Sequence, residues 1–271
     1  MIYIDTRDQL SLKHGVMDFL NVTEEELELV FETIDSVDED PYDWVKKYLE
    51  DYGIDSPLEY IQMFHLTRRL NGTDLRINNN LERLLLCKTP LSDFFKRYDV
   101  TFKKHNGHME LYYKGALQTL DDEFYAGPGN MAYIKSRLGY FDTQDYCVNG
   151  FAFRSHLEMQ SYYRSLSWSP EFVDNIGRFL EIKNMVSDYS NNSRYYCIEY
   201  LIPLSEVIFD LSNPPESEIE KTIIFLINAI VRSYKDWKHA SFVCDENLIL
   251  RLDDSTDIKR DWFVNAEEID L

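Results

Sequence analysis

The chain has 271 residues, a formal net charge of −20, and a composition of 44% hydrophobic and 14% aromatic residues. So much apolar and aromatic material excludes an intrinsically disordered chain, and the length allows one large core or two smaller ones. The excess of carboxylates repels free nucleic acid and anionic membrane surfaces, so neither is expected as the main partner.

Targeting and membrane segments are not expected from the sequence. The first ten residues, MIYIDTRDQL, lack the basic and apolar regions of a signal peptide. The longest apolar run, at 222–231, is interrupted by Asn228 and is about half as long as a membrane-spanning helix. The four cysteines lie far apart with no CxxC pair, so we expect free thiols. The sequence thus predicts a cytoplasmic protein.

Residues 1–60 predict a group of acidic helices, with 17 Asp and Glu against 4 Lys and Arg. Thr23 and Glu26 have the spacing of a capping box, which marks the start of a helix. A second helix is predicted within residues 40–53, before a glycine that ends it. We therefore expect an acidic helical subdomain at 1–60, followed by an α+β core domain at 61–271.

Residues 61–115 reverse the charge, with 10 Lys and Arg against 5 Asp and Glu. This basic segment has two interpretations. Its cations pair with the protein's own carboxylates, or they hold a phosphate or an acidic partner, and only here would nucleic acid find a binding surface. Nine of these ten cations are singled out: Arg68, Arg69, Arg76, Arg83, Lys96, Arg97, Lys103, Lys104 and Lys114.

The middle of the chain contains the clearest local signal. Residues 61–67 fit either the end of a helix or a first strand, and 79–98 predict two short helices. Residues 99–115 predict a β-hairpin, because Asn106 and Gly107 tolerate the positive φ angles of a tight turn between two alternating strands. We expect this hairpin to join the sheet of the core.

The remaining elements mix helices and strands without a regular βαβ alternation. The predicted helices are at 130–138, from 169 onward, and at 216–235; the predicted strands are at 147–153, 195–202, 241–252 and 262–264. Such an order is typical of an α+β fold with a mixed or antiparallel sheet covered by helices.

One stretch carries a resemblance. FHLTRR at 64–69 resembles the first-strand motif of ADP-ribosyltransferase-like proteins. Membership would imply an α+β fold built on split antiparallel sheets and the use of NAD. In that family a His or Arg of the first strand binds the adenosine ribose, an aromatic ring stacks on nicotinamide, and a late carboxylate holds the reacting ribose. The carboxylate stabilises the oxocarbenium-like centre that forms when the glycosidic bond breaks.

The resemblance implies a set of NAD contacts in this chain. It implies that His65, with Thr67 and Arg68 beside it, binds the cofactor, and that Tyr162 or Tyr163 stacks on nicotinamide. The structural alternative stays open, because a lone histidine on an apolar strand and two of nineteen tyrosines also fit core or surface positions.

The resemblance also implies charged residues for the later steps. Arg164 would contact a phosphate, and the late carboxylate would be Glu246 in CDENLILRL or Glu199 in YYCIEYLI. Glu246 also fits the simple end of an edge strand. No metal is expected, because His105 and His108 straddle the hairpin turn and lack enough convergent ligands.

Two functions follow from the sequence. The first is an ADP-ribosyltransferase-like protein that uses NAD, as a toxin or as a phage-defence or antidefence effector. The alternative is a non-catalytic acidic protein, an inhibitor or nucleic-acid mimic, that occupies a basic site on a protein partner. In that case the contact, otherwise a solvated surface, would be the helix that carries Glu24, Glu25, Glu26, Glu28, Glu32 and Asp35.

Overall fold

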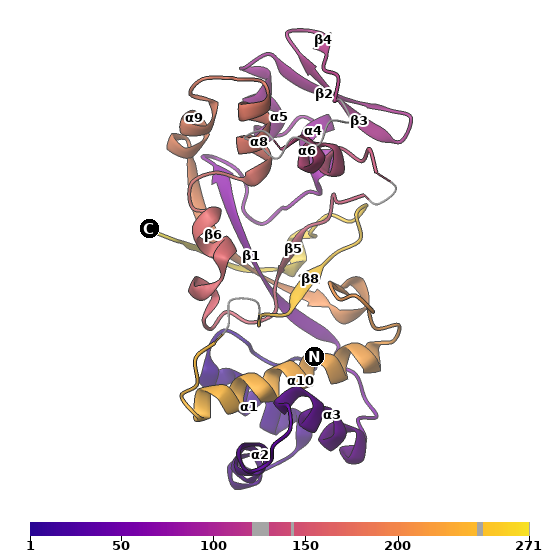
Figure 1. The fold of residues 1–271 in the computed structure, drawn as a ribbon, viewed down its shortest axis with the longest axis vertical. Helices are drawn as coiled ribbons and strands as arrows, with labels where there is room; N and C mark the ends of the chain where they lie inside the picture. Colours follow the sequence, from indigo (N-terminus) through magenta and orange to yellow (C-terminus); the bar gives the residue numbers. More distant parts are fainter. Residues whose placement is uncertain (121–129, 142–143, 243–245, 271) are drawn as a thin grey trace. The chain divides into compact units, whose positions relative to one another are not determined.

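The computed structural model describes residues 1–120, 130–141, 144–242 and 246–270 (Figure 1). These residues form ten α-helices and two antiparallel sheets, which confirms the predicted α+β class. No helix in the described ranges is long and apolar enough to cross a membrane.

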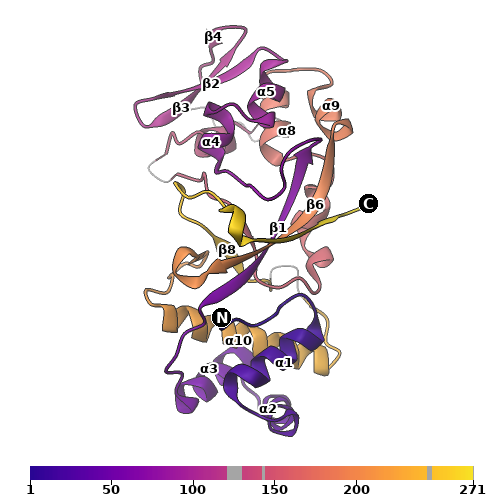
Figure 2. The ribbon, with the colours of Figure 1, turned by 180° about the vertical axis from the view of Figure 1, so that it is seen from behind.

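The chain divides into two compact units, and the division differs from the predicted boundary at residue 60. Unit 1 comprises Met1–Phe64, Asn149–Ser161 and Glu199–Arg251; unit 2 comprises His65–Val148, Tyr162–Ile198 and Leu252–Leu271. The N-terminal helices are not a separate body, because α10 (Glu218–Trp237) packs against both α1 (Gln9–Leu20) and α3 (Pro41–Tyr52) (Figure 2).

The helices of unit 1 begin where the sequence predicts. The predicted capping box closes the start of α2 (Glu24–Ser36), since Glu26 N donates to Thr23 Oγ1 and Thr23 N donates to the Glu26 carboxylate. The apolar face of α2 is buried, and the ring of Phe31 on this face packs against that of Trp237, with 5.9 Å between the ring centroids. The acidic residues of α2 are left on the outside.

The larger sheet has six strands in the order β7-β8-β5-β1-β6-β9. The segment 61–67 lies within a strand, which resolves the ambiguity of the sequence. The strands are β1 (Tyr60–Leu70), β5 (Asn149–Phe151), β6 (Ser193–Pro203), β7 (Ile208–Phe209), β8 (Ile249–Arg251) and β9 (Phe263–Glu268).

Strand β5 approaches β1 closely, as the glycine in CVNGFAF suggests. Phe64 pairs with Phe151, and Gly150 pairs with Leu250 of β8. A Cβ atom at Gly150 would lie 2.7 Å from the Phe64 carbonyl oxygen and 2.7 Å from Met63 Cγ. Only glycine fits there without moving β1, so this residue fixes the spacing of the two strands.

The predicted hairpin forms in unit 2, but the expectation that it joins the main sheet is wrong. Strands β2 (Val100–His105) and β3 (His108–Tyr113) pair around Asn106 and Gly107, whose φ angles are 48° and 88°. A second turn then returns the chain as β4 (Ala116–Leu117) alongside β3. The result is a separate three-stranded sheet.

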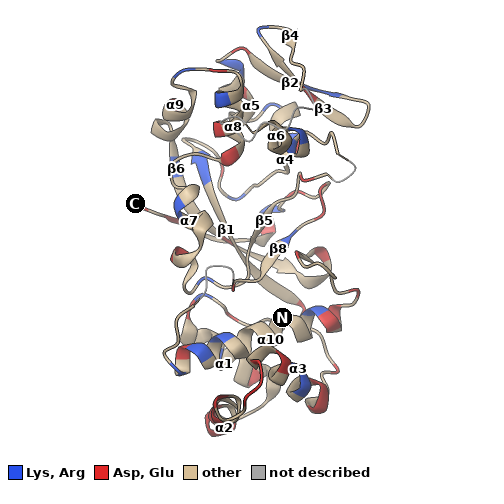
Figure 3. Cartoon of the chain, in the orientation of Figure 1, with Lys and Arg blue, Asp and Glu red and all other residues tan. Residues whose placement is uncertain are grey.

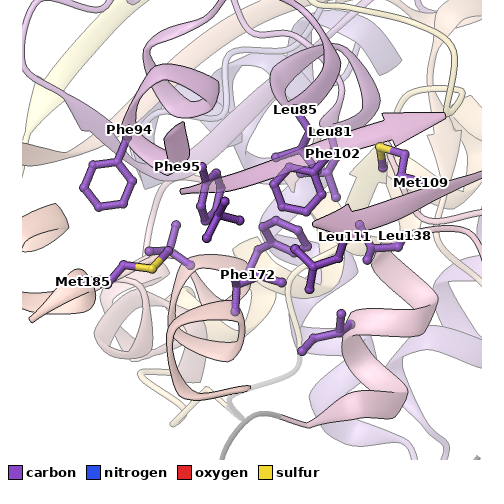
Figure 4. Packing of buried hydrophobic residues seen from close by; sticks show 14 of the residues in the cluster. Leu81, Leu85, Phe94, Phe95, Phe102, Met109, Leu111, Leu138, Phe172 and Met185 are labelled. Carbon is purple, nitrogen blue, oxygen red and sulfur yellow. The ribbon is translucent and has the colours of Figure 1, made fainter. Parts of the chain in front are cut away.

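The hairpin buries one face in a core that belongs to unit 2 (Figure 4). Phe102 lies edge-on to Phe95 at 5.3 Å between ring centroids, and Phe172 lies 5.9 Å from Phe102. Met109 and Leu111 are fully buried on the same face. These contacts explain the separate sheet, because the apolar side of the hairpin is already covered by helices. Those helices are α4 (Leu81–Leu86), α5 (Pro90–Lys96), α6 (Met131–Arg137), α8 (Glu171–Phe179) and α9 (Met185–Asn191).

Candidate functional site

Arg68, one of the candidate NAD contacts, is fully engaged within unit 2. Its Nε donates to Ser193 Oγ at 3.0 Å, and Nη2 donates to the carbonyl oxygens of Ser190 at 2.9 Å and Ser193 at 3.0 Å. Its Nη1 donates to the carbonyl oxygen of Ser167. This side chain ties β1 to the start of β6 and the residues before it, and four of its donor positions are used by the fold itself.

Strand alternation separates Arg68 from the other candidates on β1. Successive side chains of a strand point to opposite faces, so His65, Thr67 and Arg69 share one face and Arg68 lies on the other. Arg69 is only 8% exposed, and its Nε and Nη2 have no hydrogen-bond partner among the described residues. The resemblance does not single out Arg69, although counting in steps of two from His65 leads to it.

Tyr162, Tyr163 and Arg164 lie on one short helix, α7 (Ser161–Ser165). The carbonyl oxygen of Tyr163 accepts a hydrogen bond from Tyr195 Oη at 2.8 Å, and the two rings meet edge to face at 5.9 Å. Tyr162 is 52% exposed. Of the two tyrosines, Tyr162 therefore has the more accessible ring, and Arg164 is exposed beside it.

Glu199 is buried in unit 1 beside a neutral partner. Gln62 Nε2 donates to Glu199 Oε1 at 2.8 Å, and Gln62 Oε1 accepts from the backbone N of Thr6 at 2.6 Å. Burial raises the pKa of Glu199, while the charge of Arg7 and the amide hydrogen bond oppose the rise. This carboxyl group is thus fixed by the amide of the neighbouring strand.

Glu246, which precedes β8, is held in unit 1 by a cation. Its Oε1 lies 2.5 Å from Lys235 Nζ of α10, and the two side chains are only 19% and 17% exposed. Lys235 also lies over the ring of Tyr42 at 5.7 Å. Burial, and then the charge of Glu246, raise the pKa of Tyr42. Glu246 Oε2 is buried and has no hydrogen-bond partner in the described ranges.

Helix α10 presents further charged groups near Lys235. Arg232 is 4% exposed, and its guanidinium lies over the ring of Phe242 at 4.8 Å. Asp236 Oδ1 is 3.0 Å from His156 Nε2, and burial raises the pKa of Asp236 while His156 opposes the rise. Positions 232, 235 and 236 share one face of the helix, because they are three and four residues apart. The sequence RSYKD at 232–236 shows that spacing, but it does not predict that His156 lies beside Asp236.

Most cations of the basic segment have partners within unit 2. Exposed residues of the segment form ion pairs within unit 2: Arg76 with Asp74, Arg83 with Asp257, Lys96 with Asp93, and Lys104 with Glu82. The guanidinium of Arg97 and the ammonium of Lys103 lie over aromatic rings at 5.1 Å and 4.4 Å. The interpretation as internal pairing is therefore the better one for these residues.

The hairpin histidines have local partners. His105 Nδ1 lies 2.8 Å from Glu110 Oε1, and the ring of His108 lies 4.1 Å from that of Tyr140. Within the described part of the chain, no three His, Cys, Asp or Glu side chains are grouped to hold a metal ion.

The comparisons with known proteins add no relative. No protein-family model matches this sequence, and neither a curated protein nor a solved structure matches it.

Proposed function

We propose that this protein is an ADP-ribosyltransferase-like enzyme that uses NAD. The observation that carries the proposal is the strand order β8-β5-β1. His65 lies on β1, the tyrosines of α7 follow β5 along the chain, and Glu246 precedes β8. The three strands are neighbours in the sheet, although up to about 180 residues separate the residues of the resemblance in sequence.

Each residue then has a distinct task. His65, with Thr67 on the same strand face, binds the adenosine ribose, and the exposed ring of Tyr162 stacks on nicotinamide. Glu246 accepts a hydrogen bond from the 2-hydroxyl of the reacting ribose. The bond between ribose C1 and the nicotinamide nitrogen breaks, and nicotinamide leaves with the bonding electrons. A nucleophile of the acceptor attacks C1 and releases its proton.

Glu246 is the stronger of the two candidate carboxylates. Its Oε1 pairs with the Lys235 ammonium, and Oε2 has no hydrogen-bond partner in the described structure. A fixed, charged acceptor suits a developing positive centre. Glu199 is bound to a neutral amide, and burial raises its pKa, so it is less suited to carry a full negative charge. It is the reserve candidate.

The proposal is tested by NAD binding and turnover with the purified full chain. We expect nicotinamide release from wild type and transfer of labelled ADP-ribose to a component of a cell extract. Glu246→Gln should strongly slow release and keep NAD binding, whereas His65→Ala should mainly weaken binding. No NAD binding at millimolar concentration, together with no transfer to any extract, would refute the proposal.

The acidic face of α2 favours a second function, binding to a basic protein partner. Glu25 and Glu32 are exposed on α2, and Leu29 between them is 62% exposed. Figure 3 marks the acidic residues along this helix in red. Charged residues around an apolar one are common at protein interfaces. Reversal of Glu25, Glu28 and Glu32 to Lys should weaken a salt-sensitive complex. Tight duplex DNA binding at physiological salt, retained after loss of the basic segment, would contradict it.

A further inference from the structure

Strand β9 (Phe263–Glu268) is the last strand of the larger sheet, and in the described part of the chain only β6 lies beside it. Ile269 N, directly after β9, donates to the Tyr195 carbonyl oxygen of β6 at 2.8 Å. The backbone N–H and C=O groups of successive residues in an antiparallel strand point to alternate sides. Those directed away from β6 therefore belong to Val264, Ala266 and Glu268. These groups form an open edge that a further strand can join.

The open edge of β9 lacks several features that keep edge strands single. Such strands are commonly very short or carry proline or lysine, whereas β9 has six residues and contains neither. Val264 is 45% exposed, and Asn265 is exposed beside it. The charges of β9 are two carboxylates at its end, and Glu268 Oε1 lies 3.6 Å from Arg194 Nε of β6, which offsets its charge. The first four residues of the edge are thus uncharged.

A second copy of the chain fits this edge in few registers. Two copies of β9 related by a two-fold axis run antiparallel, and one residue on the axis faces its own counterpart. An axis at either glutamate of β9 would bring two carboxylates directly opposite each other, which is destabilising. An axis at the first or second residue of β9 would pair the strand with the helical turn Arg260–Trp262, which is not extended. The axis positions that remain are Asn265 and Ala266.

An axis at Ala266 gives the more complementary pairs of side chains. Phe263 then lies opposite Ile269 of the second copy, and Asn265 lies opposite Glu267 of the second copy. Both are non-hydrogen-bonded pairs, in which opposite side chains approach most closely. An apolar contact and an amide-to-carboxylate hydrogen bond can thus form twice, once on each side of the axis. An axis at Asn265 would instead place Phe263 against a carboxylate.

We propose that β9 is the interface of a two-fold dimer of this chain, with the axis at Ala266. The second copy extends the sheet through the outward backbone groups of β9, as in other strand additions. The net charge of −20 makes the two copies repel each other, and salt screens this repulsion. The dimer should therefore tighten as salt rises, whereas a complex with a basic protein should weaken. The dimer does not depend on NAD chemistry.

Sedimentation equilibrium of the full chain at low and high NaCl tests the dimer. Wild type should dimerise reversibly, and more tightly at high salt. Asn265→Asp places a carboxylate opposite Glu267 of the second copy twice per dimer, so it should raise the dissociation constant about tenfold at a given salt concentration. Asn213→Asp, the same change at an exposed residue of the loop before α10, is the matched control. A wild type that is monomeric at every salt concentration, or equal dissociation constants for the two variants, would overturn the inference.

Proline substitutions test which side of β9 is open. Ala266→Pro removes an N–H that points away from β6, so dimerisation should be lost. Ile269→Pro removes the hydrogen bond to Tyr195. At low salt, where wild type is least dimeric, Ile269→Pro should therefore lower the melting temperature more than Ala266→Pro does. Dimerisation of Ala266→Pro as tight as that of wild type would exclude this edge as the interface.

An oxidative crosslink tests the position of the axis. In the proposed dimer Ala266 faces its own counterpart, and Cα atoms about 5.5 Å apart suit a disulfide. Ala266→Cys should therefore give a covalent dimer on a non-reducing gel, in a Cys87→Ser background that removes an exposed native thiol. Val264→Cys in the same background is the matched control, because the two copies of residue 264 lie apart in this register. Crosslinking of Val264→Cys without crosslinking of Ala266→Cys would overturn the assigned axis.

Discussion

The surroundings of Glu199 and Glu246 show two ways of holding a carboxyl group within unit 1. Glu199 lies on β6, 6% exposed, and its partner is the neutral amide of Gln62. Glu246 precedes β8, and its partner is the ammonium of Lys235 at 2.5 Å. Both are shielded from water, but only Glu246 is paired with an opposite charge.

The difference matters because desolvation penalises the charged form of any acid. A neutral donor offsets that penalty weakly, so burial leaves Glu199 with a raised pKa. A cation offsets it strongly. The proposed chemistry needs a carboxylate, so a carboxyl group beside a cation, with an oxygen left for the substrate, is the better candidate.

The largest expected effect is on turnover. Glu246→Gln should lower nicotinamide release by about 10²–10³-fold, since one electrostatic contact of the transition state is lost. Glu199→Gln should retain most of the activity, because a glutamine there still accepts the hydrogen bond of Gln62. Single-turnover kinetics of both variants measure how much nicotinamide release each substitution removes. Equal losses in the two variants would abolish the distinction between the two carboxyl groups.

The next effect concerns stability and tests the ion pair directly. Lys235→Met should lower the free energy of unfolding by about 1–3 kcal/mol, because Glu246 is then shielded from water without its cation. Adding Glu246→Gln should recover part of the loss, which urea unfolding of the double-mutant cycle measures. Additive effects of the two substitutions would mean that the pair is not coupled.

Local signals predicted the elements of the fold better than its long-range arrangement. The capping box at Thr23 and the turn at Asn106 depend on residues a few positions apart, and both are confirmed. The partition into units was not predictable, because α10 joins the N-terminal helices from about 200 residues away. Periodicity gives a helix its apolar face but not the identity of its partner.

The candidate site shows the same limit at the level of single residues. Glu246 could be selected as a late carboxylate, but its pairing with Lys235 depends on the packing of α10. Arg68 and Arg69 are equivalent in composition, and only the strand's alternation distinguishes the satisfied guanidinium from the one without partners. The sequence supplied the residue types, whereas burial and hydrogen bonding decided their roles.

A smaller effect is the pH dependence that Glu199 should impose on stability. Its pKa is raised above the ordinary 4.5, so the unfolded chain releases this proton at a lower pH than the folded protein. The contribution of Glu199 to stability is complete below pH 4.5 and is lost as pH rises through the folded-state pKa. The residue at position 199 does not titrate in Glu199→Gln. The melting temperature of this variant minus that of wild type should increase across this window and then level off. A constant difference would contradict the raised pKa.

The smallest effect is expected for an exposed ion pair. Comparing it with the shielded pair of Lys235 and Glu246 measures how much burial adds to the strength of an ion pair. Lys104 Nζ lies 2.8 Å from both oxygens of Glu82, about as close as Lys235 lies to Glu246, but the Lys104 side chain is 49% exposed. Water and salt screen such a pair, so Lys104→Gln should lower the free energy of unfolding by no more than about 1 kcal/mol. The loss should shrink further in 1 M NaCl, whereas the coupling between Lys235 and Glu246 should persist there. Urea unfolding at low and high salt measures both. A salt-resistant loss for Lys104→Gln, equal to that of Lys235→Met, would mean that charge pairing alone, without burial, stabilises this protein.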